Sequence, residues 1–174
     1  MRAIPAAEKE VVATVLFSAA GIIGVLLAPW DSPAVAPTAL FYAVLVINTW
    51  FSIRFFAHLP PTDRNETLID GILTILYLAL ALTIGRTVPF MGIATVLFLS
   101  AVAKYALLLR LIEYPRTLRR KMVIDCLGAL LCLVALVAAM AGFDSASAWA
   151  LAAVFAAANV FLLLVRPMYR VLDS

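Results

Sequence analysis

The chain has 174 residues, of which 66% are hydrophobic and 13% are charged, and its mean hydropathy is +1.09. Soluble domains are about half apolar and a quarter charged, so this composition excludes an ordinary soluble protein and indicates one that uses lipid as its solvent. The net charge is +3, but the cations stand at the ends of apolar segments, where they set membrane orientation. We therefore expect the lipid bilayer as a partner, and no nucleic acid.

Charged residues divide the chain into six apolar segments, each of which predicts a transmembrane helix. A helix needs about 20 residues to cross the hydrocarbon, and in lipid only helices satisfy the backbone of such long runs. The first segment is longer than the apolar core of a signal peptide, so we interpret it as a retained helix. The predicted helices cover residues 11–30, 37–57, 68–85, 89–112, 122–142 and 147–166.

The cations predict the orientation of this all-α, polytopic membrane protein. Eleven lysines and arginines fall on one side of a six-crossing arrangement, Arg86 falls on the other, and Lys104 lies within the fourth helix. Cytoplasmic loops carry the excess of positive charge, which predicts a protein of the inner membrane with both termini in the cytoplasm. The short connections predict three antiparallel hairpins in a single domain over residues 1–174.

Polar residues recur once per hairpin at spacings of 55 or 56 residues. A repeat of this length fits one helical hairpin, so we expect a threefold internal repeat. Six helices with even loops would give a similar period without a repeat. The recurring residues are Arg54, Arg110 and Arg166 at the ends of even-numbered helices, Asn48, Lys104 and Asn159 within them, and Asp70 and Asp125 where odd-numbered helices begin.

Lys104 stands well inside an apolar segment. A lysine in the hydrocarbon costs about 2.5–3.5 kcal/mol on insertion scales, so it needs a partner, and Asp70 and Asp125 are the best candidates. Asn48 and Asn159 lie at an equivalent depth. These five residues predict either a polar pathway through the bundle or a set of buried ion pairs.

Cations at helix C-termini are favoured by the helix dipole, at about 0.3–1 kcal/mol each. Arg54, Arg110 and Arg166 occupy such positions, and an aspartate follows two of them across a loop. We expect an interfacial ring of ion pairs on the cytoplasmic side.

Small residues form a stripe on each of the last two helices. Small stripes let membrane helices approach closely, so we expect a packing seam within the last hairpin, with homo-oligomer contact as the alternative. The seam comprises Gly128, Cys132, Ala135, Ala139 and Gly142 on the fifth helix and Ala148, Ala152 and Ala156 on the sixth.

Catalytic and cofactor motifs are not evident. The chain has one histidine, His58, and neither a Gly-x-Ser-x-Gly motif nor a phosphate loop. Its two cysteines, Cys126 and Cys132, would lie on different faces of one helix. We expect no catalytic, cofactor-binding or metal-binding residue, and no cofactor, so the sequence favours a protein that is not an enzyme.

One stretch resembles the second to fourth helices of voltage-sensor domains. It combines WFSIRFF at residues 50–56, LID at residues 68–70 and a fourth helix that carries Lys104. The resemblance implies a bundle in which cations on the fourth helix respond to voltage. It ends at Leu107, where that pattern has another cation, so no family is assigned.

Three classes of function follow. The preferred one is a non-catalytic scaffold or accessory subunit of a larger membrane complex, with a membrane-protein partner or a second copy of itself. The alternative is a small permease or channel whose polar path passes Lys104, Asn48 and Asn159. The third class is a voltage-sensor-like bundle or an enzyme that acts on lipid headgroups.

Overall fold

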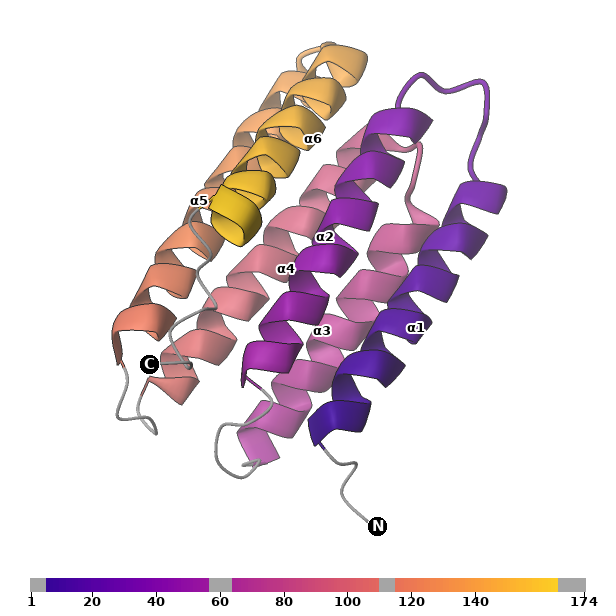
Figure 1. The fold of residues 1–174 in the computed structure, drawn as a ribbon. Helices are drawn as coiled ribbons and strands as arrows, with labels where there is room; N and C mark the ends of the chain where they lie inside the picture. Colours follow the sequence, from indigo (N-terminus) through magenta and orange to yellow (C-terminus); the bar gives the residue numbers. More distant parts are fainter. Residues whose placement is uncertain (1–5, 57–63, 110–114, 166–174) are drawn as a thin grey trace.

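The structure is a computed structural model that describes residues 6–56, 64–109 and 115–165. These residues form six α-helices and one short π-helical turn (Figure 1). The elements are α1 (Ala6–Leu26), α2 (Val35–Phe56), α3 (Arg64–Leu82), α4 (Thr87–Leu108), α5 (Pro115–Met140), α6 (Asp144–Val160) and the π-helix η1 (Phe161–Val165).

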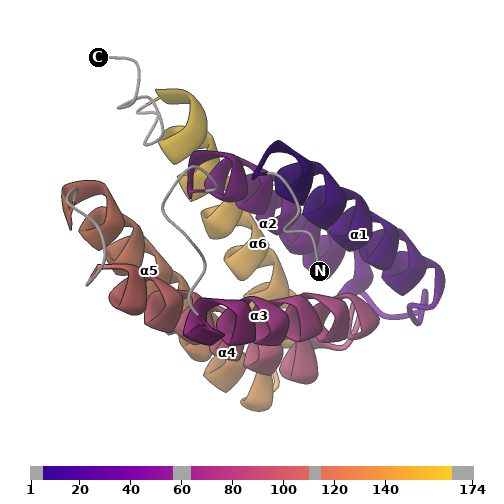
Figure 2. The ribbon, with the colours of Figure 1, turned by 90° about the horizontal axis from the view of Figure 1, so that it is seen from below.

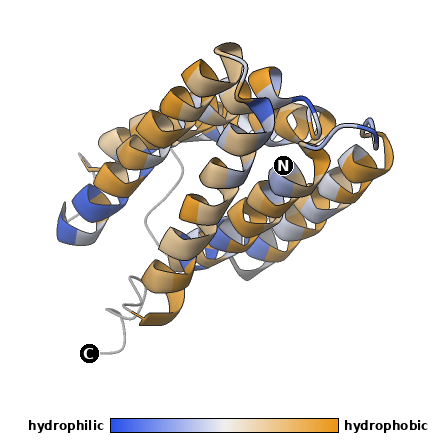
Figure 3. Ribbon diagram, turned by 90° about the horizontal axis from the view of Figure 1, so that it is seen from above, coloured by the Kyte–Doolittle hydropathy of each residue, from blue (hydrophilic) through white to orange (hydrophobic). Residues whose placement is uncertain are grey.

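Four of the helices are long and apolar enough to cross a membrane, which agrees with a membrane protein. They are Val35–Phe56, Thr87–Leu108, Arg116–Met140 and Asp144–Val165, while Glu10–Leu26 and Thr67–Leu82 are shorter apolar helices. Figure 3 shows mostly hydrophobic colour along the helices, with the deepest blue towards helix ends and connections.

Hydroxyl side chains inside the helices bond to their own backbone. Each donates to the carbonyl oxygen four residues earlier, at 2.6–2.9 Å, which satisfies the hydroxyl hydrogen within its own helix. The side chains are Thr14, Thr38, Thr49, Thr74, Thr95 and Ser100.

Two glycines with positive φ end helices. Gly85 (φ 83°) lies between α3 and α4, and Gly142 (φ 93°) lies between α5 and α6; only glycine adopts this conformation readily. Gly85 also joins two connections, because its N–H donates to Thr38 Oγ1 (3.0 Å) and its carbonyl accepts from Ser32 Oγ (2.8 Å).

Consecutive helices run in opposite directions (Figure 1). We call one end of the bundle the basic end, where α2 and α4 finish and α3 and α5 begin. The exposed side chains of Arg54, Arg116, Arg119 and Arg120 lie there. We call the other end, where the α3–α4 and α5–α6 connections lie, the turn end.

The helices pack in a closed ring in the order α1, α2, α6, α5, α4, α3. Figure 2 shows this arrangement from the basic end. Each predicted hairpin packs internally, but the most extensive contact joins α4 and α5, which belong to different hairpins. The hairpins meet one another through α2–α6, α4–α5 and α1–α3, three unlike pairings. This ring therefore gives no support to a threefold repeat related by rotation.

Several helix limits differ from those predicted. The fifth helix was expected at residues 122–142, but α5 begins at Pro115, so its basic residues form its first two turns. Proline suits the first turn of a helix because it needs no hydrogen-bond donor there. The fourth helix was expected to reach residue 112, but α4 ends at Leu108.

Four phenylalanines fill the bundle where the even-numbered helices meet. Phe41 of α2 stacks on Phe155 of α6 with ring centroids 4.3 Å apart, and Phe90 and Phe98 of α4 meet Phe41 at 5.6 and 6.4 Å. All four side chains are buried. We call them the phenylalanine cluster; it makes this part of the bundle apolar and closed.

Candidate functional site

A cavity of about 270 Å³ lies in the half of the bundle nearer the basic end. Its lining comes from the parts of α1 to α5 between the middle of the bundle and the basic end. The cavity, called here the polar cavity, is rich in polar side chains: Asn48, Thr49, Ser52, Asp70, Thr74, Tyr77, Lys104, Tyr105, Lys121 and Asp125.

Lys104 of α4 pairs with Asp70 of α3 in the wall of the polar cavity. Its Nζ lies 2.5 Å from Asp70 Oδ1, and the two side chains are 22% and 47% exposed. The pair joins two neighbouring helices of the ring and is partly exposed. Its exposure marks the outer, more accessible part of the cavity wall.

A second ion pair lies deeper. Lys121 Nζ donates to Asp125 Oδ1 at 2.7 Å, one turn apart on α5, and the side chains are only 5% and 2% exposed. The ammonium also lies 5.9 Å from the centroid of the Tyr105 ring, within the range of a cation–π interaction.

The other carboxylate oxygen of Asp125 is unsatisfied. Within the described part of the chain, Oδ2 is buried and has no hydrogen-bond partner. A buried acceptor left in this state costs about 1–3 kcal/mol, and more when it is charged. Because Asp125 lines the polar cavity, a donor from water or a bound molecule could satisfy this oxygen.

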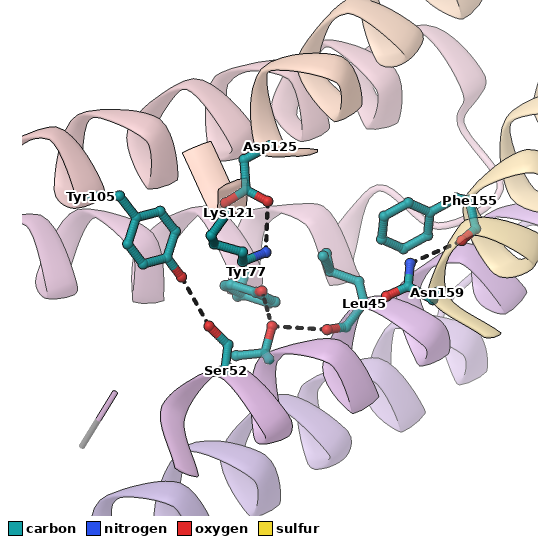
Figure 4. A network of polar contacts seen from close by, with 9 residues as sticks. Leu45, Ser52, Tyr77, Tyr105, Lys121, Asp125, Phe155 and Asn159 are labelled. Atoms are coloured by element: carbon teal, nitrogen blue, oxygen red, sulfur yellow. Dashed lines mark hydrogen bonds and ion pairs between the residues drawn. The ribbon is translucent and has the colours of Figure 1, made fainter. Parts of the chain in front are cut away.

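Hydroxyl pairs connect α2 to α3 and α4 across the cavity (Figure 4). Tyr105 of α4 bonds to Ser52 of α2 at 2.9 Å, and Tyr77 of α3 bonds to Thr49 of α2. Thr49 also donates to the carbonyl oxygen of Leu45 at 2.8 Å. These bonds fix the tyrosine rings, so the cavity has a defined polar wall.

The phenylalanine cluster closes the polar cavity towards the turn end. Phe98 belongs to both, because it lines the cavity and packs on Phe155 with centroids 5.7 Å apart. The bundle therefore has a polar half next to the basic end and an apolar half beyond Phe98.

The residues predicted to form a polar pathway are brought together in part. Asn48, Asp70, Lys104 and Asp125 all line the polar cavity. Asn159 is outside its lining and is buried, with its amide donating to the carbonyl oxygen of Phe155 at 2.9 Å (Figure 4). Of the two predicted partners for Lys104, the structure selects Asp70, while Asp125 pairs with Lys121.

The predicted interfacial ring is not observed where the structure describes it. Arg54 is exposed and lies over the Trp50 ring, 5.4 Å from its centroid. The aspartates expected to pair with arginines are held by lysines instead. Arg110 and Arg166, like His58, lie outside the described residues.

The residues of the predicted seam lie in three places: the main core, the contact between α5 and α4, and the α5–α6 turn. Cys132, Ala135, Ala139, Ala148 and Ala152 are buried in the main core, and Ala156 is partly buried. A side chain at Gly128 would meet the Phe98 ring at 3.0 Å, so Gly128 faces α4 and not α6. Gly142 is exposed in the α5–α6 turn and is wrong as a seam residue, because its positive φ ends α5.

Six polar residues of the cavity were missed by the sequence analysis: Thr49, Ser52, Thr74, Tyr77, Tyr105 and Lys121. Lys121 looked like part of a basic loop, although its spacing of four from Asp125 is the spacing of helical ion pairs. Tyr77 and Tyr105 stand in apolar runs with no distinguishing pattern, so no sequence signal identifies them.

The described residues contain no group of three or more His, Cys, Asp or Glu side chains that could hold a metal ion. A second, larger hollow of about 720 Å³ lies between α1 and α2 and has a mainly apolar lining. None of the predicted pathway residues lines it.

The side chains of the polar cavity are suited to binding a small molecule. Two paired ammonium–carboxylate groups, hydroxyls and an amide surround a space of small-molecule size, with one buried oxygen in need of a donor. No family model matches the sequence, and comparisons with curated proteins and with solved structures give no match.

Proposed function

We propose that this chain is a small permease of the inner membrane that carries a small polar solute through the polar cavity. The observation that carries the proposal is the cavity itself. Two ion pairs and several hydroxyls line a space of about 270 Å³ within a bundle of apolar helices. Ionisable groups in such a position are costly and mark solute or ion pathways in membrane proteins.

The proposal includes six crossings. The apolar parts of α1 and α3 are short, but α3 has 19 residues, or about 28 Å at 1.5 Å per residue. This nearly equals the hydrocarbon thickness of about 30 Å. Both helices are members of the ring beside helices long enough to span, which supports six spans over four.

We place the basic end in the cytoplasm. Exposed arginines gather there, whereas Arg86, Asp31 and Asp144 stand in or beside the connections of the turn end. The excess of positive charge on the cytoplasmic side of membrane proteins supports this orientation. Both termini are then cytoplasmic, and the polar cavity faces inward.

Transport in this proposal requires the phenylalanine cluster to part. The polar cavity stops at Phe98, which supports interpreting this conformation as inward-facing and closed towards the outside. Alternating access would move helices of the ring relative to one another and separate Phe41 from Phe155 and Phe98. Movement of packed elements around a central binding site is common among transporters.

Flux through the purified protein tests the proposal. Reconstituted vesicles are challenged with small polar probes (acetamide, glycerol, glycine and methylammonium), and entry is followed by vesicle swelling or isotope uptake. We expect at least one probe to enter faster than into protein-free vesicles. Ala101→Trp, which fills the polar cavity from α4, should lower this flux at least tenfold.

Ala103→Trp is the matched control, because Ala103 is exposed on the same helix and should leave flux unchanged. Equal flux through both tryptophan variants, or no flux of any probe, would contradict a permease. A preparation that carries a second membrane protein in fixed ratio and passes no solute would instead support the accessory-subunit hypothesis.

A further inference from the structure

The charges that line the polar cavity are already balanced. Among the described residues its charged side chains are Lys104, Asp70, Lys121 and Asp125, two cations and two anions. Each ammonium is within 2.7 Å of a carboxylate oxygen. A ligand with a net charge would therefore bring an uncompensated charge between the buried side chains of Lys121 and Asp125, which is unfavourable.

The one buried side-chain atom without a hydrogen-bond partner that the described residues place in the cavity is an acceptor. Oδ1 of Asp125 receives the Lys121 ammonium, while Oδ2 is buried without a hydrogen-bond partner. A carboxylate oxygen accepts only N–H or O–H donors. A solute that completes this site must therefore supply a donor hydrogen at Asp125.

The size of the cavity limits the solute. A cavity of about 150 Å³ holds benzene, a molecule of six non-hydrogen atoms. By that scale a space of about 270 Å³ holds a solute of roughly ten non-hydrogen atoms. The Ser52–Tyr105 and Thr49–Tyr77 hydroxyl pairs give such a solute further polar contacts on the α2 side (Figure 4).

We infer that the polar cavity binds small solutes without net charge that carry N–H or O–H donors, such as amides and polyols, and that the donor binds to Oδ2 of Asp125. This inference rests on the proposed permease, because it names the class of solute that the cavity would carry. It assigns Asp125 as the binding residue and leaves Lys121 as the group that holds Asp125 in place.

Equilibrium binding to the full chain in detergent tests this inference apart from transport. Saturation-transfer NMR suits weak ligands, and the probes differ in one property at a time: acetamide and glycerol carry donors, N,N-dimethylacetamide lacks them, methylammonium is a cation and acetate is an anion. We expect acetamide or glycerol to bind and the other three to bind at least tenfold more weakly.

Asp125→Asn keeps the shape of the side chain and an oxygen for Lys121 but replaces Oδ2 by a donor. Binding of the neutral probe should weaken at least tenfold in this variant. It should be unchanged in Asp144→Asn, the same replacement at an exposed aspartate. If Asp125→Asn does not fold, the comparison of acetamide with N,N-dimethylacetamide in the natural chain decides alone.

Three results would overturn the inference: tighter binding of methylammonium or acetate, full binding by Asp125→Asn, or no binding by either donor probe, in which case water alone satisfies Asp125. Binding without flux would refute the permease and keep the inference. Flux that depends neither on Asp125 nor on an N–H or O–H donor of the solute would support the permease and refute the inference.

Discussion

Two lysine–aspartate pairs line one cavity, but they differ in how far each is removed from solvent. The side chains of Lys104 and Asp70 are 22% and 47% exposed, whereas those of Lys121 and Asp125 are 5% and 2% exposed. Exposed pairs are worth about 0–1 kcal/mol. Removing one partner of a buried pair costs about 3–5 kcal/mol, because the other charge stays buried without compensation.

Replacing Lys104 or Lys121 by methionine should therefore change the free energy of unfolding by unequal amounts. Lys104→Met should lower the free energy of unfolding by about 1 kcal/mol or less, since Asp70 can still reach solvent. Lys121→Met should lower it by about 3–5 kcal/mol, and adding Asp125→Asn should restore most of that loss. Reversible unfolding in detergent of these three variants and of the natural chain measures these differences. Similar losses in the two lysine variants would show that the burial of Asp125 does not determine how much stability is lost when its lysine partner is removed.

Single residues were predictable from the sequence where their charge differs from that of their sequence neighbours. Lys104 was identified because it is a lone cation in an apolar run, and Asp70 was one of two partners proposed for it. Lys121 follows Arg119 and Arg120 directly, so the same reasoning placed it in a solvated loop. Lys121 is buried because α5 packs against α4, and the residues next to Lys121 in the sequence do not reveal this contact.

Helix limits were predicted from charges, and this method fails where a helix extends beyond the apolar run. α5 begins at Pro115 and includes three arginines before its apolar part. Helical structure continues there because arginine and lysine are good helix formers, and their long side chains can reach the membrane interface. The existence and order of the six helices were predictable; the pairing of α4 with α5 was not.

Two helix contacts are close at glycines. A side chain at Gly24 of α1 would lie 2.1 Å from the carbonyl oxygen of Ala81 in α3. In α5, Gly128 leaves room for the Phe98 ring. Small residues therefore determine the α1–α3 and α4–α5 contacts, whereas the alanines of the predicted seam belong to the main core with Leu151 and Phe155.

Enlarging a buried alanine tests the close packing of the last two helices. Ala139 is 3% exposed, so Ala139→Leu should separate helices and lower the free energy of unfolding by about 1–3 kcal/mol. Ala150→Leu adds the same atoms at an exposed position of α6 and should change little. Thermal unfolding in detergent compares them. Equal melting temperatures would show that Ala139 is not part of a close helix contact.

At the scale of the whole molecule, the bundle separates polar from apolar interior along its axis. Both ion pairs and the tyrosine hydroxyl pairs lie in the half beside the basic end, and the phenylalanine cluster occupies the interior beyond Phe98. The described residues do not form a polar path across the whole bundle, and Asn159 lies outside the lining of the polar cavity. The arrangement is that of a cavity with one closed side.

The central claim is that an aqueous, solute-sized cavity enters this bundle from its basic end, and thiol accessibility measures it directly. Ala101 lines the cavity and Ala103 is exposed on the same helix, so in a bilayer Ala103 would face lipid. Each is replaced by cysteine in a Cys126→Ser background, because Cys126 is exposed and Cys132 is buried.

Oriented membrane vesicles are treated with a membrane-impermeant thiol reagent from either side, with Ala146→Cys at the turn end as the reference for the outer face. The account predicts that Ala101→Cys reacts from the cytoplasmic side alone, that Ala146→Cys reacts from the outer side alone, and that Ala103→Cys reacts from neither. Equal reaction of Ala101→Cys and Ala103→Cys, or reaction of Ala101→Cys only from the outer side, would contradict it.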